Sequence, residues 1–121
     1  MYKIGVDKEN SIIAVTLTGL MALDEVDAYI AALKAAFAQY ALQDYAMVID
    51  VSGCPIQSQE MIRSMGEHMA MMPKARALAV VTGSSLAKMQ IRRLFTQSYA
   101  RIVTTVSEGH AWVAEGIEPS S

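Results

Sequence analysis

Short runs of apolar and β-branched residues, separated by polar segments, predict the strands of this chain. Residues 4–6 and 12–18 form two such runs, and the polar segment 7–11 between them is typical of a turn. We therefore expect an antiparallel hairpin at the start of the chain. Two nearly continuous apolar runs, Tyr45–Val51 and Ala77–Thr82, have the pattern of strands that are covered on both faces.

Between these strands, apolar residues recur at the spacing of amphipathic helices. The four predicted helices are Glu25–Ala41, residues 57–72, Leu86–Tyr99 and Glu108–Ala114. Residue types that favour the N-cap position precede the first, third and fourth of these helices, and these are Asp24, Gly83–Ser85 and Ser107. The second helix opens at Gln57 or Ser58. Pro73 is expected to end the second helix, because proline disfavours helical geometry in the residue before it.

The predicted elements follow one another in the order β-β-α-β-α-β-α-β-α, with Ile102–Val106 as the fifth strand. Alternation of strands and helices after the hairpin predicts right-handed crossovers onto one sheet. The predicted fold class is α/β, with a five-stranded mostly parallel sheet, an N-terminal antiparallel hairpin and four helices. No linker or repeat divides the chain, so we expect a single domain over residues 1–117 and a disordered tail over residues 118–121.

The composition is that of a folded domain, because 53% of the 121 residues are hydrophobic and only 18% are charged. No apolar run approaches the roughly 18–20 residues that a membrane span requires, and the first residues lack the pattern of a signal peptide. We therefore expect a cytoplasmic protein without integral membrane association. With the single Cys54, neither an internal disulfide nor a cysteine-based metal site is expected.

Charge is distributed unevenly around a net value of −2. Residues 1–60 carry three basic and eight acidic side chains, whereas residues 61–121 carry seven basic and four acidic ones. The basic side chains are scattered and lack interleaved aromatic residues, so nucleic acid is not an expected partner. His68 and His110 do not have the spacing of metal ligands, and no metal or cofactor is expected.

Polar loops follow the two long apolar strands. Because the carboxyl ends of parallel strands meet at one edge of a sheet, these loops are expected to be neighbours, beside helix N-termini that favour anions. The candidate partner or ligand contacts are Ser52, Gly53, Cys54 and Ser58 in the first loop, and Thr82, Gly83, Ser84, Ser85 and Lys88 in and after the second. The alternative for the second loop is an ordinary capped helix with a solvated basic face, since the loop lacks the spacing of a Walker motif.

Catalysis has little support in the sequence. Cys54 lies between a strand and a helix N-terminus, a position that can lower a thiol pKa, but neither histidine has a motif spacing that places a base beside it. Asp50 has no second carboxylate nearby in sequence and is interpreted as orienting the backbone of its loop. We therefore expect a protein that is not an enzyme, with Cys54 as a small, partly buried apolar residue.

Methionines form a stripe along the second predicted helix, at Met61, Met65, Met69 and Met72. Methionine side chains are flexible and polarizable, and they suit apolar surfaces that accept variable shapes. The stripe therefore predicts contact with a partner helix or a lipid-like ligand, and Met61, Met65 and Met69 join the candidate contacts. The alternative is the ordinary packing of an amphipathic helix on the sheet.

The order of elements, with Asp50-Val-Ser-Gly53 closing the middle strand and Ser58 at the start of the next helix, resembles the STAS domain family of anti-sigma-factor antagonists such as SpoIIAA. The segment Val106–Val113 is similar to the SpoIIAA-like branch that is grouped with lipid-binding domains of the CRAL-TRIO type. In antagonists of the sporulation type, the loop reads Asp-Ser-Ser/Thr-Gly and a partner kinase phosphorylates its first serine. The resemblance implies Ser58 as the phosphorylation site, and only the serine of that motif is present in Gln57–Glu60.

These features together predict a non-enzymatic STAS/SpoIIAA-like regulatory or protein-interaction module. Its expected partner is another protein or a second copy of itself, in a homodimer. The alternative is a protein that binds or carries a small apolar or amphipathic, lipid-like ligand, with the methionine stripe lining its cavity.

Overall fold

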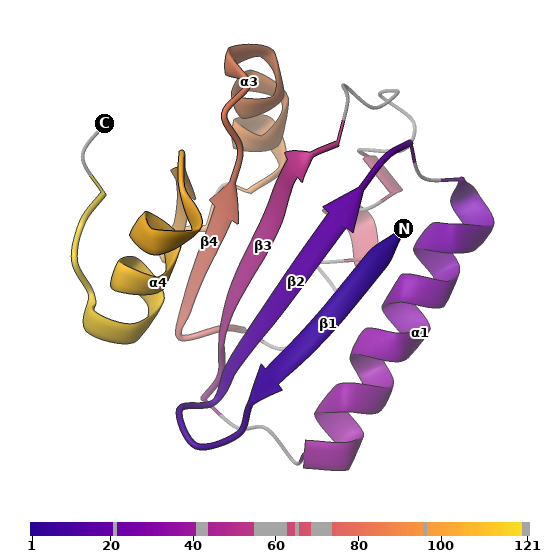
Figure 1. The fold of residues 1–121 in the computed structure, drawn as a ribbon, viewed down its shortest axis with the longest axis horizontal. Coiled ribbons are helices and arrows are strands. Elements are labelled where there is room, and N and C mark those ends of the chain that lie inside the picture. The colour runs from indigo at the N-terminus through magenta and orange to yellow at the C-terminus, as the bar shows by residue number, and fades with distance from the viewer. Residues whose placement is uncertain are drawn as a thin grey trace.

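The computed structural model describes residues 1–20, 22–40, 44–54, 63–64, 66–68, 74–95 and 97–119. Its strands are β1 (Tyr2–Asp7), β2 (Ile12–Thr18), β3 (Ala46–Gly53), β4 (Ala77–Val81) and β5 (Ala100–Val103). Its helices include α1 (Leu23–Tyr40), α3 (Ser85–Leu94) and α4 (Val106–Glu115), and residues 63–64 and 66–68 are helical between β3 and β4 (Figure 1). In this part of the chain no helix has both the length and the apolar character to cross a membrane.

The strands lie in the sheet in the same order as along the chain. β1 and β2 are antiparallel, and the pairs β2–β3, β3–β4 and β4–β5 are parallel. The arrowheads of β2, β3 and β4 therefore point to one edge of the sheet in Figure 1. The predicted α/β fold, with a mostly parallel sheet of five strands that starts with an antiparallel hairpin, is confirmed.

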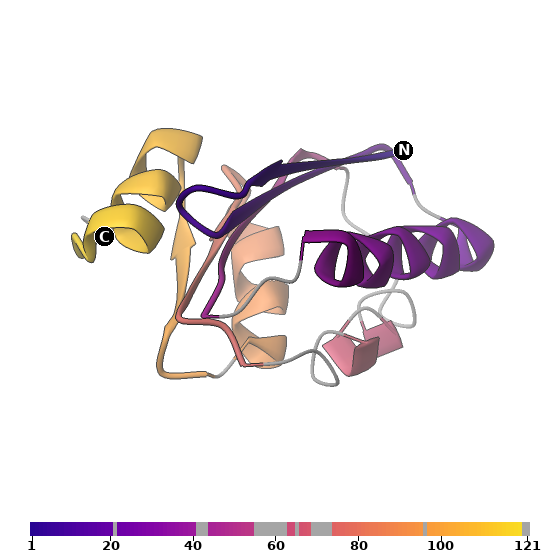
Figure 2. The same cartoon turned by 90° about the horizontal axis from the view of Figure 1, so that it is seen from below.

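The order of the strands determines which face of the sheet each helix covers. Every parallel connection, from β2 to β3, from β3 to β4 and from β4 to β5, moves by one strand in the same direction. Because such crossovers are right-handed, the segments that make them lie on one face of the sheet. α4 follows the last strand and is not part of a crossover, and it packs on the opposite face (Figure 2).

Alternating side chains of the strands build two apolar cores, one on each face of the sheet. The core beneath α1 includes Ile13, Val15, Leu17, Val26, Tyr29, Ile30, Leu33, Met47 and Ile49. The core beneath α4 consists of Ile12, Ala46, Val48, Ala77, Ala79, Val81, Val103 and Val113, with Trp112 packed against it. Alanine and valine dominate the second core, so α4 lies close to the sheet.

α1 begins at Leu23, so the prediction that Asp24 is its N-cap is wrong. The amide of Val26 donates to the carbonyl of Ala22 at 3.0 Å, which places the first helical hydrogen bond two residues earlier than predicted. Asp24 lies instead in the first turn, where its Oδ1 accepts a hydrogen bond from the amide of Glu25 at 3.0 Å. Both acidic side chains still lie at the positive end of the helix dipole.

The third crossover helix is shorter than predicted, and the fifth strand starts earlier. α3 ends at Leu94 instead of Tyr99, and β5 covers Ala100–Val103 instead of Ile102–Val106. The amide of Leu78 in β4 donates to the carbonyl of Tyr99 at 3.1 Å, so Tyr99 already takes part in the pairing of the sheet. This long-range hydrogen bond outweighs the apolar spacing that suggested a longer helix.

α4 is capped by Thr105, and the prediction of Ser107 as its cap is wrong. The helix begins at Val106, and the Oγ1 of Thr105 accepts a hydrogen bond from the amide of Glu108 at 3.1 Å. Thr105 and Glu108 have the spacing of a capping box, whereas Ser107 lies inside the first turn. Gly116, in the left-handed region with φ of 68°, follows the last turn.

The chain after α4 folds back against β5. Arg101 forms an ion pair with Glu118, with 2.7 Å between Nη2 and Oε1, and its guanidinium lies 4.3 Å from the centre of the Trp112 ring. Glu118, the first residue of the predicted tail 118–121, thus contacts the domain. The last two residues of that tail lie outside the described residues, and the domain boundary stays a prediction.

Candidate functional site

Two of the predicted loops lie next to each other at one edge of the sheet. β3 ends at Gly53 and the neighbouring β4 at Val81, and Asp50 is the register partner of Val81. β3 therefore continues beyond the end of β4 by residues 51–53, and both loops follow at the same edge of the sheet. We use the name rim for the edge at which β2, β3, β4 and β5 end, which comprises residues 18–20, 22–23, 52–54, 82–89 and 104–106.

A tight turn at Asp50 and Ser52 shapes the end of β3. Oδ1 of Asp50 accepts hydrogen bonds from the amide of Ser52 at 2.9 Å and from its hydroxyl at 2.6 Å. The amide of Cys54 then donates to the carbonyl of Val51 at 3.0 Å. Asp50 thus orients the backbone of its loop, and the Ser52 hydroxyl is engaged as a donor.

Cys54 is half-buried beside this turn, and its Sγ donates to the carbonyl of Leu17 at 3.1 Å. Burial is the main reason why the pKa of the Cys54 thiol is raised, and the negative charges of Asp50 and Glu25 act in the same direction. A thiol with a raised pKa stays protonated near neutral pH, whereas a nucleophile requires the thiolate. The environment of Cys54 is therefore that of an unreactive thiol.

The start of α3 is capped within its own loop. Oγ of Ser84 accepts a hydrogen bond from the amide of Ala87 at 3.2 Å, and Oγ1 of the buried Thr82 accepts one from the amide of Ser84 at 3.2 Å. The remaining candidates here are the exposed Gly83 and Ser85 and the half-buried Lys88. This geometry is that of a capped helix, and binding of a ligand or partner by these residues stays a prediction.

Four of the predicted contacts lie outside the described residues, and these are Ser58, Met61, Met65 and Met69. Met72, the last member of the methionine stripe, lies outside them as well. Phosphorylation of Ser58 and the role of the stripe therefore stay predictions.

One group of rim residues is not evident from the sequence pattern. Seven large apolar side chains are exposed in the described part of the chain. Six of them belong to the rim or flank it, and these are Met1, Leu20, Leu23, Leu86, Met89 and Val106. Met1 flanks the rim because its backbone pairs with Thr18. The sequence does give one indication, because the apolar Leu20 follows Gly19 just after the end of β2.

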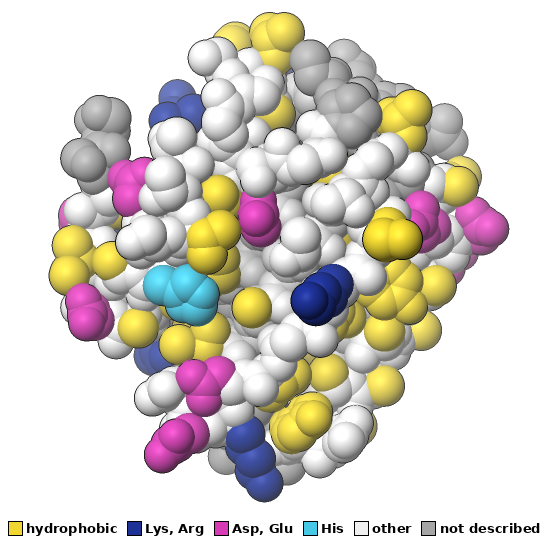
Figure 3. Space-filling model, viewed as in Figure 1, with side chains coloured by type: hydrophobic (Ala, Val, Ile, Leu, Met, Phe, Trp, Pro, Cys, Tyr) yellow, Lys and Arg dark blue, Asp and Glu magenta, His cyan; other side chains and the backbone are white. Residues whose placement is uncertain are grey.

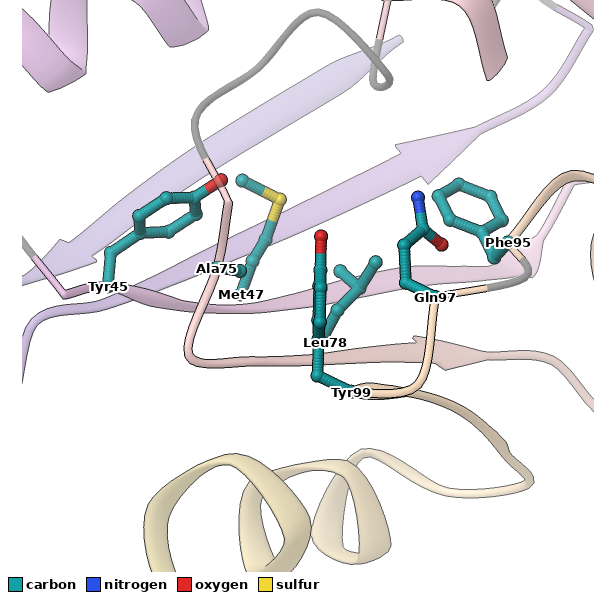
Figure 4. Close-up of a pocket in the computed structure, with 7 residues that line it drawn as sticks. All are labelled: Tyr45, Met47, Ala75, Leu78, Phe95, Gln97 and Tyr99. Atoms are coloured by element: carbon teal, nitrogen blue, oxygen red, sulfur yellow. The ribbon is translucent and has the colours of Figure 1, made fainter.

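A small cavity lies at the opposite ends of β3 and β4, on the α1 side of the sheet. It is lined by Tyr45, Met47, Ala75, Leu78, Phe95, Gln97 and Tyr99 (Figure 4). Its volume of about 20 Å³ has room for about one water molecule, far less than a lipid-like ligand needs. Oε1 of Gln97 is buried there, without a hydrogen-bond partner among the described residues. The cavity gives no support to the carriage of an apolar ligand.

The two histidines are separated by the sheet. Nε2 of His68 lies 3.8 Å from Oδ1 of Asp27 on α1, whereas His110 is exposed on α4, on the opposite face. Within the residues that the structure describes, no three histidine, cysteine, aspartate or glutamate side chains are close enough to hold a metal ion.

The fold has a solved counterpart. The structure resembles the crystal structure of an anti-sigma factor antagonist from Mycobacterium paratuberculosis, with a TM-score of 0.66 over 93% of this chain and 94% of that chain. The two sequences are 16% identical, so the likeness is one of fold. No protein-family model matches the chain, and no curated protein matches it. The predicted resemblance to the STAS/SpoIIAA-like fold is thus confirmed through the structure.

Proposed function

We propose that the protein is a regulatory module that acts by binding a protein partner through its rim. The observation that carries this proposal is that, of the seven exposed large apolar side chains in the described residues, six lie in or beside the rim. Leu20 is 71% exposed, Leu86 61% and Met89 58%. Exposed apolar side chains that gather on one surface are typical of protein-binding sites. Covering them on association would remove apolar surface from water, which favours binding.

The charge of α3 indicates the kind of partner. This helix carries Lys88, Arg92 and Arg93 and has no acidic residue. Leu86, Met89 and Arg93 follow one another at intervals of three and four residues, so they share one exposed face of the helix. A partner surface that combines apolar side chains with carboxylates complements this face in both respects.

The shared fold also supports the proposal. The solved counterpart is named as an antagonist of an anti-sigma factor, and an anti-sigma factor is itself a protein. We infer that the partner of the present chain is a regulatory protein of this kind. The hydrogen-bonded turn at Asp50 and the protonated thiol of Cys54 are compatible with a surface for binding rather than for catalysis.

Site-specific cross-linking in the producing cell tests this function. A photo-reactive amino acid at position 86 is expected to capture a partner protein that mass spectrometry identifies. The same amino acid at position 117 is the matched control, because Ile117 is 53% exposed but lies away from the rim. Equal yields at both positions, or no captured protein at position 86, would contradict the proposal.

Reversing the charge of α3 then tests whether the captured partner binds this helix or only lies near it. Arg92→Glu combined with Arg93→Glu is expected to lower the yield of the cross-linked partner at least about tenfold, because the acidic partner surface would be repelled. Lys8→Glu combined with Lys34→Glu is the control, since both lysines are exposed and lie outside α3. If the two double variants lowered the yield equally, the partner would not be recognised by α3.

A further inference from the structure

The face of the sheet that carries α4 is only partly covered. α4 lies over β3, β4 and β5, where its Gly109 is next to Val48, Ala79 and Val103. On the same face, the exposed residues of β1 and β2 are Lys3, Gly5, Asp7, Ala14, Thr16 and Thr18. Figure 3 shows this face, on which backbone, uncharged polar and apolar atoms outnumber those of charged side chains. β2 and β3 are a parallel pair, and such pairs are normally covered on both faces, so this surface is suited to a partner.

One row of three side chains crosses this open face. Lys3 is the register partner of Thr16, and Thr16 is the register partner of Asp50, so all three point to the same side of adjacent strands. With strands about 4.8 Å apart, the Cα atoms of Lys3 and Asp50 lie about 10 Å apart, on either side of Thr16. The row has a cation at one end, a carboxylate at the other and a small neutral residue between them.

We propose that a second copy of the chain covers this face, with the two sheets packed against each other. A twofold axis between the sheets, running along β2 over Thr16, brings Lys3 of each copy opposite Asp50 of the other. Thr16 then meets Thr16 of the other copy. The row is thus complementary to the same row of a second copy. A surface with charges of one sign would instead repel its own copy. This dimer uses the sheet face and leaves α3, with Leu86 and Met89, available for a protein partner.

The side chains along this face fit the proposed contact. Gly5 and Ala14 are register partners in the next row, so no long side chain holds the two sheets apart. Oδ1 of Asp50 is occupied by Ser52, but Oδ2 accepts no hydrogen bond and Lys3 makes no ion pair within the described ranges. Each Lys3 can therefore pair with the second carboxylate oxygen of Asp50 in the other copy. In this arrangement α4 of one copy lies beside β1, the edge strand, of the other.

The shared surface is small, which sets the expected strength of the dimer. Because α4 covers β3 at Val48, the open surface consists of β1 and β2, with about five residues each, and Asp50 beside them. It spans at most roughly 14 by 17 Å, well below the area of a standard stable interface. We therefore expect a weak dimer that forms only at high protein concentration. Because two ion pairs contribute, the dimer should dissociate further as the salt concentration rises.

Sedimentation velocity of the full chain, from about 10 μM to about 1 mM, tests the proposal. The unaltered chain is expected to shift from monomer to dimer over this range. Lys3→Glu should raise the dissociation constant at least about tenfold, because the introduced carboxylate would face Asp50 of the other copy. Lys8→Glu is the matched control, since it makes the same charge change in the exposed hairpin turn.

A double variant makes the test specific for this pair of residues. Asp50→Asn alone should weaken the dimer, but added to Lys3→Glu it should strengthen it, because it removes the repulsion. Asparagine also keeps an oxygen that can accept the hydrogen bonds of Ser52. Such a reversal of effect is expected only if the two side chains meet across the interface.

A second variant tests the packing without a change of charge. Ala14→Tyr suits an exposed strand position, but its ring would hold the two sheets apart, so the dimer should be lost while thermal unfolding of the monomer is unchanged. A chain that remains monomeric at about 1 mM and low salt would overturn the proposal. So would a dimer that Lys3→Glu and Lys8→Glu weaken equally, or one that Ala14→Tyr leaves intact. None of these substitutions alters α3, so failure of the dimer would leave the cross-linking test at position 86 unaffected.

Discussion

Gly109 of α4 lies directly on Val48 of β3, and a Cβ added to the glycine would be only 3.3 Å from Cγ1 of the valine. The same Cβ would be 3.4 Å from Cβ of Ala79 and 3.5 Å from Cγ2 of Val103. The backbone of α4 is therefore about as close to the sheet as the strand side chains permit. This contact determines how near the helix lies to the strands that it covers.

A large apolar residue at position 109 is expected to displace α4 from the sheet. Gly109→Leu should lower the free energy of unfolding by about 3 kcal/mol, measured by urea denaturation, because the added carbons have no space. Gly109→Ala should change it by less than about 1 kcal/mol, because slight crowding opposes the better helix propensity of alanine. Ala114→Leu adds similar bulk at an exposed position of the same helix, and its effect should be within about 0.5 kcal/mol. Equal losses for the two leucine variants would contradict the packing of α4.

The cap of α4 gives a second prediction. Thr105→Ala should lower the free energy of unfolding by about 1 kcal/mol, because the amide of Glu108 loses its acceptor. Thr105→Ser retains a hydroxyl and should recover most of this stability. Ser107→Ala should change stability by less than about 0.5 kcal/mol, since position 107 lies inside the first turn. Thermal denaturation of the three variants checks the order, and a larger loss for Ser107→Ala would mean that the helix starts later.

The fold is largely predictable from the sequence because each element has a clear pattern of burial. The predicted run Tyr45–Val51 contains β3 from Ala46 to Val51, since a strand covered on both faces needs continuous apolar residues. The errors fall at element ends. Thr105 and Ser107 are both good N-cap residues two positions apart, and the choice between them depends on where β5 starts. The start of β5 is set by the pairing of Ala100 with Leu78. These residues are 22 positions apart in the sequence, so the local pattern of apolar residues does not predict their pairing.

Cys54 is expected to react slowly with alkylating reagents. Burial raises the pKa of its thiol, so the thiolate that attacks the reagent is scarce at pH 7.5. Alkylation by iodoacetamide, followed by mass spectrometry, should be at least about tenfold slower in the folded chain than in urea. A chain with Cys54→Ser and Gln39→Cys is the control, because position 39 is exposed on α1 and should react almost equally under both conditions. A folded Cys54 that reacted as fast as the control thiol would indicate an activated cysteine.

The buried Tyr45 predicts how stability changes in alkali. Burial, with a smaller contribution from nearby Tyr99, raises the pKa of Tyr45 to about 12. An unfolded tyrosine ionises near pH 10, so above this pH the unfolded chain binds fewer protons than the folded one. Stability is therefore expected to be unaffected by Tyr45 below about pH 10 and to fall as pH rises from about 10 to 12. Burial also raises the pKa of Tyr29, so titration of tyrosine absorbance should show a late phase that Tyr45→Phe reduces but does not abolish. Ionisation of Tyr45 near pH 10 would contradict its burial.

The candidate site is less predictable than the fold. That segments 52–54 and 82–85 share one edge follows from the parallel order of β3 and β4, which the sequence pattern predicts. The exposure of Leu86 and Met89 does not follow, because apolar residues at helical spacing fit a buried stripe equally well. Which face of α3 packs on the sheet is decided by tertiary contacts. The apolar character of the rim therefore emerges only with the three-dimensional structure.

The match between strand order and chain order bears on how this sheet assembles. No strand has to insert between two strands that are already paired, so each new strand adds to a free edge. During synthesis the β1–β2 hairpin can form first from local contacts, and each following helix and strand can extend the sheet as they emerge. α4 emerges last and completes the second core only when all the strands are in place.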